Sequence, residues 1–482
     1  MLFRSSRIFW LFALTHLVLW TVVPSLSRYE LDTDSMMHFA WGQEWMGSYR
    51  LHPPVLPWLI GGFFKIAPIN NWTYNLLTQL TFLAAFYCIW RIAREVLPPY
   101  QAVAAVCLLE FIPYFSFFSM RLNHSSLLIP MWAATVLLAY LAIQRGQYRY
   151  WVGLGLFSAL AMLTKYYSAA LLPGIALYLL LFPEGRATLK TAGPYLALIT
   201  FLSLMGWHVW YVFAHNMGTI SHVGDYIGTD FSTRLSGLRF LGAQTLYLAP
   251  LVLIFFLSRW RHPAGGTQEL PSPATATGSR NTRFIYWMFW FPLLGSAIVG
   301  FIAGIDLSSR WGGPTLNLAG IVLLLIASGS FTQRAAKRLF WAVGGWVVAI
   351  PSVLLLSGLA SYDREMYHFP GKELGQEITK RWRERFERPL KFVGGGASAP
   401  NSIAFHSPDH PSVLQHLSTV WSPWIQPSDI EREGIAIVCV AADSRCTSNT
   451  AKLFPGSGMA PLTVKAQPRI FFPGSEREFL YL

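Results

Sequence analysis

Two aspartates follow the first long apolar segment of the chain, in the stretch LDTDSMMHFAWGQEWMGSYRLHPP at residues 31–54. A carboxylate there could act as a general base toward a hydroxyl or amine, or hold a divalent metal ion against a phosphate. Asp34 is therefore a candidate catalytic residue and the one candidate metal ligand, and Asp32 is a second candidate catalytic residue. The alternative is that both are plain charges at a membrane interface.

His52, at the end of this stretch, precedes two prolines that fix the backbone, so its imidazole is held at a set place. The segment HPPVLPWLIGGFFKI, residues 52–66, is too short and too rich in proline for a confident membrane span. It suits a helix lying in the membrane interface, with Lys65 near its end. The prolines are also compatible with the simple start of a helix.

Cations that could bind a phosphate lie farther along the chain. Lys165, followed by Tyr166, interrupts a long apolar run, and a charge in such a run is costly and usually functional. A lysine that reaches the interface is the alternative. Arg310, in DLSSRWGGP, can give two parallel hydrogen bonds to a phosphate. Arg121 and Lys65 are further candidates, whereas Glu110 lies inside an expected span and has no assigned role.

The elements that position these residues are expected to be membrane helices. The chain has 482 residues, of which 53% are hydrophobic and 13% charged. Its apolar blocks are about the length that a helix needs to cross ~30 Å of hydrocarbon, and they are continuous rather than alternating. We expect about eleven spans, at residues 8–26, 72–90, 100–118, 127–143, 151–163, 169–182, 192–213, 239–258, 284–304, 315–330 and 339–358.

The distribution of Lys and Arg predicts the orientation of these spans. If the N-terminus is cytoplasmic, the inner loops are strongly enriched in cations and the outer loops are nearly balanced. All the candidate site residues then face the outer side. The net charge of +13 and the pI near 9.6 are explained mainly by topology, so they do not indicate nucleic-acid binding.

The chain after residue 360 changes in composition. We expect residues 1–360 to form a transmembrane domain and residues 361–482 a small soluble α/β domain, which an odd number of spans places outside. KELGQEITKRWRERFERPLKFV predicts its first amphipathic helix, and GIAIVCVAA predicts a buried strand. Cys439 and Cys446 lie close together there, and the sequence leaves open whether they form a disulfide.

A carboxylate, several cations and aromatic side chains at one membrane face fit the transfer of a group from a lipid-linked phosphate. The cations would neutralise the departing phosphate, and the carboxylate would take the proton of the acceptor. This chemistry is glycosyl transfer. No nucleotide-binding GxGxxG or Walker motif occurs in the chain.

The same motifs carry a resemblance to a known group. WGQ, GSYRLHPP, LNHSSLL, GLFSALAMLTKYYSAALLP and SRWGGP, in this order, resemble the GT-C glycosyltransferases of the protein-mannosyltransferase and aminoarabinose-transferase group. Within that group the sequence is most similar to bacterial enzymes that add sugars such as galacturonic acid to lipopolysaccharide core or lipid A. The resemblance covers most of residues 1–360.

The resemblance implies a fold, substrates and a location. It implies the GT-C architecture in the bacterial inner membrane, a periplasmic active site, a polyprenyl-phosphate sugar donor and an acceptor such as lipid A. Asp34 matches the first-loop acid of the family, while Ser35 stands where a glutamate is common, so Asp32 is the substitute. Lys165, Tyr166 and Arg310 match positions near the donor phosphate.

One further departure from the family pattern and two alternative functions remain. Asn123, His124 and Ser125 stand where many relatives have Asn-Pro-Asp, so a divalent metal ion is an open question and no other cofactor is expected. A protein O-glycosyltransferase would differ only in its acceptor. A transporter or flippase for lipid-linked sugar would instead carry charged residues at mid-membrane depth and paired broken helices.

Overall fold

The computed structural model describes residues 2–215, 218–259, 276–327, 331–360, 368–467 and 475–482. The chain divides into two compact units, each described here by itself. Unit 1 comprises Met1–Trp20 and Thr78–Ile350, and unit 2 comprises Thr21–Leu77 and Pro351–Leu482. The expected division between residues 360 and 361 adjoins residues 361–367, which lie outside the described part of the chain, and it stays a prediction.

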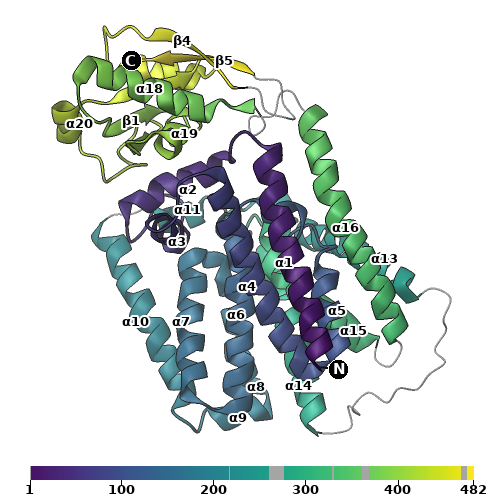
Figure 1. Cartoon of the computed structure of the whole chain (residues 1–482). Coiled ribbons are helices and arrows are strands. Elements are labelled where there is room, and N and C mark those ends of the chain that lie inside the picture. Colours follow the sequence, from purple (N-terminus) through teal and green to yellow (C-terminus); the bar gives the residue numbers. More distant parts are fainter. Residues whose placement is uncertain (1, 216–217, 260–275, 328–330, 361–367, 468–474) are drawn as a thin grey trace. The chain divides into compact units, whose positions relative to one another are not determined.

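Unit 1 is built from helices (Figure 1). Three helices cross the boundary between the units: α1 (Leu2–Ser27), α4 (Asn71–Val96) and α16 (Gln333–Ala360). The other α-helices are α5 (Pro99–Leu109), α6 (His124–Arg145), α7 (Tyr148–Thr164), α8 (Leu172–Leu181), α9 (Pro183–Thr188), α10 (Gly193–Ala214), α11 (Thr219–Gly224), α12 (Phe231–Arg234), α13 (Ser236–Arg259), α14 (Ala276–Ala303) and α15 (Ala319–Ile326). The 3₁₀ helices are η1 (Phe117–Met120), η2 (Tyr166–Ala170) and η3 (Ser309–Leu316).

The expectation of a mostly helical membrane protein is confirmed, but the number of eleven spans is not. Within the described residues, seven helices are long and apolar enough to cross a membrane. They are Ser5–Ser27, Asn71–Val96, His124–Arg145, Gly193–Ala214, Phe231–Arg259, Arg280–Ala303 and Gln333–Leu356. The four other expected spans fall on shorter helices: α5, α7, η2 with α8, and η3 with α15. Residues 328–330 of the expected span 315–330 lie outside the described residues.

The helices of unit 1 pack closely around the segments that carry the candidate cations. In Figure 1, α6, α7 and α10 run side by side, and η3 packs against α6, α13 and α14. A Cβ on Gly155 of α7 would overlap the backbone of Ala197 on α10, so these two helices approach as closely as small-residue contacts allow. Trp132, Trp151 and Tyr140 are fully buried among them. The short η2 and η3 segments are therefore held by a rigid framework.

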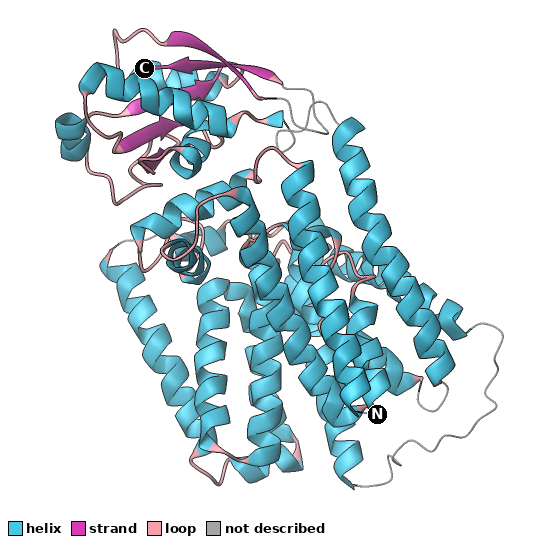
Figure 2. Cartoon of the chain, viewed as in Figure 1, coloured by secondary structure: helices cyan, strands magenta, loops and turns pink. Residues whose placement is uncertain are grey.

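Unit 2 combines two helices of the first loop with an α/β arrangement from the C-terminal segment. The first-loop helices are α2 (Thr33–Glu44) and α3 (Val55–Phe64). The C-terminal elements are α18 (Gly371–Phe386), β1 (Phe392–Gly395), α19 (Ala399–His406), β2 (Ser412–Gln415), α20 (Pro427–Glu433), β3 (Ala436–Val440), α21 (Ser444–Leu453), β4 (Ala460–Lys465) and β5 (Glu476–Tyr481). The sheet has the order β2-β1-β3-β5-β4 (Figure 2).

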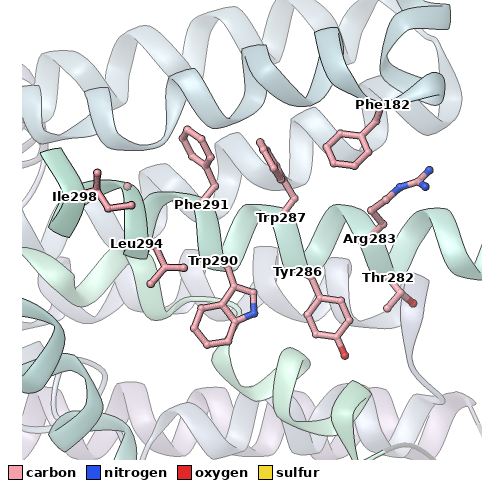
Figure 3. A pocket seen from close by; sticks show the side chains of 10 residues that line it. Phe182, Thr282, Arg283, Tyr286, Trp287, Trp290, Phe291, Leu294 and Ile298 are labelled. Carbon is pink, nitrogen blue, oxygen red and sulfur yellow. The ribbon is translucent and has the colours of Figure 1, made fainter.

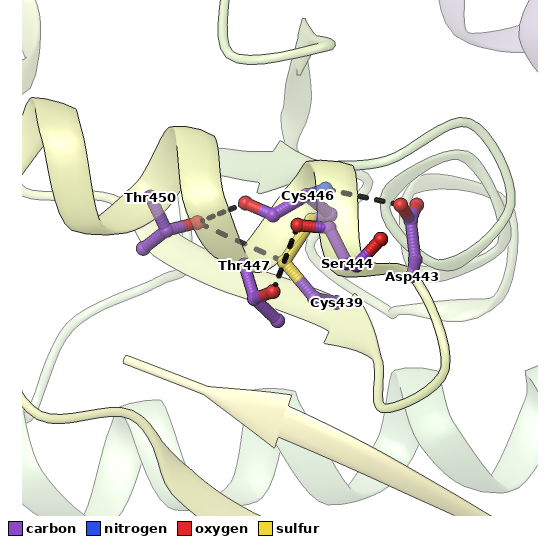
Figure 4. The surroundings of a disulfide bond; sticks show 6 residues. All are labelled: Cys439, Asp443, Ser444, Cys446, Thr447 and Thr450. Atoms are coloured by element: carbon purple, nitrogen blue, oxygen red, sulfur yellow. Dashed lines mark hydrogen bonds between the residues drawn. A yellow bond between two sulfur atoms is a disulfide. The ribbon is translucent and has the colours of Figure 1, made fainter.

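The sheet is mixed, and its centre is buried as the sequence predicted. β1 is parallel to β2 and β3, whereas β5 is antiparallel to β3 and β4. The predicted strand in GIAIVCVAA is β3, whose first four residues are all buried, and the predicted amphipathic helix is α18. Cys439 of β3 and Cys446 of α21 form a disulfide, and Asp443 caps α21 by accepting a hydrogen bond from the Cys446 amide (Figure 4).

Candidate functional site

Lys165 lies directly after α7, where the helix ends and the backbone becomes extended. Its Nζ donates a hydrogen bond to Ser125 Oγ at 2.9 Å and lies 4.4 Å from the centre of the Trp311 ring. Within the described residues, no acid lies within ion-pair distance of it. Burial lowers the pKa of Lys165 to about 7. An incoming anion would therefore restore a charge that the free protein only partly holds at neutral pH.

Two tyrosines fix the segment that follows Lys165. Tyr166 OH shares a hydrogen bond with His208 Nε2 of α10 at 2.7 Å, and Tyr167 OH shares one with Ser296 Oγ of α14 at 2.9 Å. The Tyr167 ring also lies 5.6 Å from the Trp311 ring. η2 is thus tied to three other elements, which leaves little freedom to the position of Lys165.

Arg310 lies on η3, and its side chain is exposed. No acid within the described part of the chain forms an ion pair with it. Two side chains hold the backbone of this segment. Gln244 Nε2 donates to the Ser309 carbonyl at 3.0 Å, and Tyr114 OH donates to the same oxygen. Gly312 leaves room for Gln244, since a Cβ there would overlap the amide of that side chain. The guanidinium is consequently presented on an anchored segment.

The structure brings Lys165 and the segment of Arg310 together through Trp311, whose ring contacts both Lys165 and Tyr167. We call Lys165, Tyr166, Tyr167, Arg310 and Trp311 the Lys165 cluster. Two cations that no described acid neutralises, one of them against an aromatic ring, can bind a phosphate in a partly apolar setting, where each charge–charge interaction is stronger than in water.

The loop before α6 reaches this cluster through Ser125. Asn123 begins α6 with a capping box, since its side chain accepts from the amides of Ser125 and Ser126, both at 3.0 Å. Asn123 therefore has a structural role in this chain. Arg121 lies two residues earlier and is half-buried; it belongs to the same loop.

The two aspartates differ in their surroundings. Asp32, 8% exposed, is the N-cap of α2, and its carboxylate accepts from the Ser35 amide at 3.3 Å and from Ser35 Oγ at 2.8 Å. Asp34, in the first turn of α2, is exposed and makes no hydrogen bond or ion pair with the described residues. One carboxylate is thus used for capping, and the other is available to a ligand.

His38 and His52 are the two histidines that follow these acids in the first loop. Burial lowers the pKa of His38 to about 4, against a smaller opposite effect of Asp32, so His38 is neutral at physiological pH. His52 accepts a backbone hydrogen bond from Tyr49 at 3.1 Å, and α3 begins directly after Pro54. The proline pair therefore does start a helix, and it also fixes the turn that carries His52.

Lys65 lies in unit 2 and not with the other cations. Its Nζ is 4.2 Å from the centre of the Trp45 ring, and its side chain is exposed. Of the residues proposed from the sequence, Lys165, Tyr166, Arg310 and Arg121 belong to unit 1, and Asp32, Asp34, His52 and Lys65 belong to unit 2. The structure describes the geometry within each set.

The described side chains do not fit a metal site on their own. No group of three His, Cys, Asp or Glu residues in the described parts of the chain is arranged to hold a metal ion. Asp32 is occupied by its cap, which leaves Asp34 as a single carboxylate where a divalent ion requires several oxygen ligands. No step of the chemistry below is therefore derived through a metal.

Four polar residues of the site were not identified from the sequence. His208, Ser296, Gln244 and Tyr114 support the Lys165 cluster from α10, α14, α13 and the turn after α5. Their place in the sequence could have identified three of them. His208, Gln244 and Ser296 each lie inside an expected apolar span, where a polar side chain requires a partner.

An apolar pocket of about 770 Å³ runs along α14 in unit 1 (Figure 3). Figure 3 shows its aromatic side chains in a row between Arg283 at one end and Ile298 at the other. Arg283 binds both carboxylate oxygens of Glu184 at 2.7 Å, so the charge at that end is already neutralised. The other end is lined by Leu294, Gly295 and Ile298.

Comparisons with known proteins agree with the motifs. Residues 51–211 match the family described as dolichyl-phosphate-mannose-protein mannosyltransferase. The chain is 26% identical over 256 residues to the lipid A galacturonosyltransferase RgtD of Rhizobium johnstonii (strain DSM 114642 / LMG 32736 / 3841). This match covers 50% of the chain and 51% of RgtD, so it spans about half the length of that curated relative.

The fold is similar to that of a solved structure. The crystal structure of ArnT from Cupriavidus metallidurans bound to undecaprenyl phosphate matches 98% of this chain and 97% of that chain, with a TM-score of 0.58 and 13% sequence identity. The resemblance to the GT-C glycosyltransferases related to lipid A sugar transferases is thereby confirmed.

Proposed function

We propose that this chain is a membrane glycosyltransferase that moves a sugar from a polyprenyl-phosphate donor to lipid A or lipopolysaccharide core. The observation that carries the proposal is the Lys165 cluster. Its two cations have no acidic partner among the described residues and lie on anchored segments of a protein that shares the fold of ArnT. The similarity to RgtD makes galacturonic acid the first sugar to test.

The proposed reaction has one displacement step. Lys165 and Arg310 bind the donor phosphate, with Arg121 as a further cation, and Tyr166 lines the pocket. Asp34 takes the proton of the acceptor hydroxyl as its oxygen attacks the anomeric carbon from the side opposite the phosphate. The bond from this carbon to the phosphate oxygen breaks, polyprenyl phosphate leaves, and the anomeric configuration inverts. The cations stabilise the leaving phosphate.

The assignment of the base to Asp34 rests on its availability. Its carboxylate is exposed and makes no hydrogen bond within the described residues, whereas the carboxylate of Asp32 caps α2. We further propose that the apolar pocket along α14 accepts a lipid chain, and that Lys65 and His52 contribute to substrate binding from unit 2. No nucleic acid and no nucleotide takes part.

We place the enzyme in the bacterial inner membrane with its active site and C-terminal domain in the periplasm. The shorter apolar helices would then complete about eleven spans, which places the C-terminal domain outside. The disulfide between Cys439 and Cys446 supports an oxidising compartment. The enrichment of Lys and Arg in the opposite loops supports the same orientation.

A variant of Asp34 tests the mechanism. We expect Asp34→Asn to abolish sugar transfer while binding of undecaprenyl phosphate is retained. Glu431→Gln, which removes an exposed carboxylate on α20 of the same unit, is the matched control and should transfer at the normal rate. Transfer at the normal rate by Asp34→Asn would exclude Asp34 as the base.

The sugar and acceptor are identified by mass spectrometry of lipid A and lipopolysaccharide from a deletion strain. A missing sugar mass names both at once. An unchanged glycolipid with a missing sugar on secreted proteins would favour a protein O-glycosyltransferase, the activity that the name of the matched family suggests. Variants that lose transfer but still move the donor across the bilayer would indicate a flippase.

A further inference from the structure

Unit 2 joins the first loop to the C-terminal segment through the side chain of Glu30. This carboxylate, 4% exposed, lies two residues before the cap of α2. One of its oxygens accepts from Ser402 Oγ at 2.7 Å, and both lie 3.0 Å from His406 Nε2. Ser402 and His406 are one turn apart on α19, so a single helix face holds the carboxylate.

The surrounding residues are shaped for this contact. A Cβ on Gly371, the first residue of α18, would overlap the Glu30 carboxylate, so only glycine leaves it room. Between the two polar residues of α19, the Phe405 ring packs 4.9 Å from Phe39 of α2 and 6.3 Å from Phe64 of α3. An apolar contact and a polar one therefore fix α19 against the first loop.

The first loop is tied to the C-terminal segment at two further points. Tyr29 OH donates to Glu373 Oε1 of α18 at 2.9 Å and to the Gln467 carbonyl at 2.8 Å. At the far end of α2, Ser412 of β2 donates to Glu44. α2 is thus held at both ends by elements that follow it by more than 300 residues in the chain.

A ligand at Glu30 is excluded by its surroundings. The cavity beside Glu30 has a volume of about 20 Å³, which is room for one water molecule and not for a sugar or a phosphate. Asp34, by contrast, is exposed and has no hydrogen bond within the described residues that would orient it. Its position therefore depends on the backbone at the start of α2, which Asp32 caps and which Glu30 ties to α19.

We infer that Glu30 is a positioning residue for Asp34, and that the C-terminal domain serves the reaction by holding α2 through Ser402 and His406. This inference rests on the proposed role of Asp34 as the base. A base must be held within a fraction of an ångström of its working position, and a displacement of about 1 Å can cost about a hundredfold in rate.

The test compares four full-length variants in one transfer assay, with the sugar that the deletion strain identifies. We expect Glu30→Ala to lower kcat by about a hundredfold without changing the affinity for undecaprenyl phosphate, because the Lys165 cluster belongs to unit 1. Glu30→Gln should retain more activity, since its amide oxygen still accepts from Ser402. His406→Gln should lie between these two. The melting temperature of each variant reports whether it folds.

Glu433→Ala is the matched control, because it removes a paired carboxylate of the same unit whose partners, Lys391 and Arg432, lie outside α2. It should turn over at the normal rate. A normal kcat for folded Glu30→Ala, or an equal loss in Glu30→Ala and Glu433→Ala, would overturn the positioning role while Asp34→Asn stays inactive. Normal transfer by Asp34→Asn would instead remove the proposed base, and the inference with it.

Discussion

Unit 1 holds two groups of polar residues in apolar surroundings. They differ in whether their charged side chains have partners of opposite charge within the protein. The Lys165 cluster presents cations that have no acidic partner within the described residues. The second group, which we call the Glu110 network, consists of His16, Trp20, Gln79, Glu110, Ser119 and Trp346. Its members form hydrogen bonds with one another.

Glu110 is fully buried. Both of its carboxylate oxygens and its backbone carbonyl have hydrogen-bond partners. Trp20 Nε1 donates to Oε1 at 3.0 Å, and His16 Nδ1 lies 2.8 Å from Oε2. Its backbone carbonyl accepts from Trp346 Nε1 at 3.0 Å. The network thereby joins α1, α5 and α16.

The network also fixes its own net charge. Gln79 Nε2 donates to the Ser119 carbonyl at 2.9 Å, so its Oε1 faces His16 Nε2, at 3.2 Å, as an acceptor. His16 Nε2 must then carry a proton. One further proton lies between His16 Nδ1 and Glu110, and the pair is neutral whichever atom holds it. Such a pair avoids the cost of an isolated buried charge.

The comparison shows that a charged residue in an apolar run does not by itself indicate a ligand site. A transporter would be expected to carry charged residues at mid-membrane depth, and Glu110 at first suggests this. Its partners are all supplied by the protein, however, so a structural role explains it. The cations of the Lys165 cluster have no acidic partner in the part of the chain that the structure describes. This difference distinguishes a group suited to binding a ligand from one that stabilises the fold.

Among the variants that compare the two groups, the largest predicted effect comes from removing a cation of the Lys165 cluster. Arg310→Ala should lower kcat/KM for transfer by about a hundredfold. The bound donor would bury the pair of Arg310 with its phosphate, and truncating one partner of a buried, hydrogen-bonded charge pair costs about 2–5 kcal/mol. Arg310→Lys keeps the charge without the planar fork and should lose less. Folded protein should form in normal amounts. Near-normal kcat/KM for Arg310→Ala would remove Arg310 from the donor site.

The Glu110 network should respond in the opposite way. Glu110→Ala leaves His16 and Trp20 without their acceptor, so we expect a loss of about 3 kcal/mol in the free energy of unfolding. Thermal unfolding of the purified protein measures this effect. The affinity of the remaining folded molecules for undecaprenyl phosphate should be unchanged. A weaker affinity with normal stability would place Glu110 in the binding site instead.

The sequence predicted the Lys165 cluster better than the Glu110 network, for a physical reason. An unpaired cation in an apolar run is costly wherever it lies, so Lys165 could be recognised from its neighbours in the chain. The role of Glu110 depends on His16, which is 94 residues away, and on the packing of α1 against α5. No local pattern encodes that contact.

A similar limit applies to the elements around the site. The long apolar helices, α18 and β3 followed from composition and periodicity, while α5 ends at Leu109, short of its predicted end, before the turns around Pro113. The capping role of Asp32 had a local signal in its residue type, because Asp is a preferred N-cap residue. The support of Lys165 by His208 and Ser296 arises only when α10 and α14 pack against η2.

The pH dependence of donor binding should be an intermediate effect. Burial lowers the pKa of Lys165 to about 7, so the free protein loses this charge as the pH rises through about 7. A bound phosphate favours the charged form, raises the pKa, and couples binding to proton uptake. The affinity should therefore be nearly constant below pH 7 and fall above it, by up to about tenfold per pH unit.

Lys165→Arg is the control for this dependence, because a guanidinium stays protonated throughout the range. Its binding curve reports the titration of undecaprenyl phosphate itself, measured for example by calorimetry between pH 6 and 9. The difference between the two curves is the contribution of Lys165. Parallel curves would show that Lys165 does not change its protonation on binding.

The smallest predicted effect lies at the edge of the Glu110 network. Trp346→Phe keeps an aromatic ring beside Phe111, whose centre is 5.2 Å away, and removes the hydrogen bond to the Glu110 carbonyl. One such bond contributes about 1 kcal/mol to the free energy of unfolding, so the melting temperature should fall by a few degrees while transfer is unchanged. Trp341→Phe, at an exposed position of the same helix, should leave both unchanged. If Trp346→Phe instead altered transfer at a normal melting temperature, the network would be coupled to the site, and the separation between the two groups would fail.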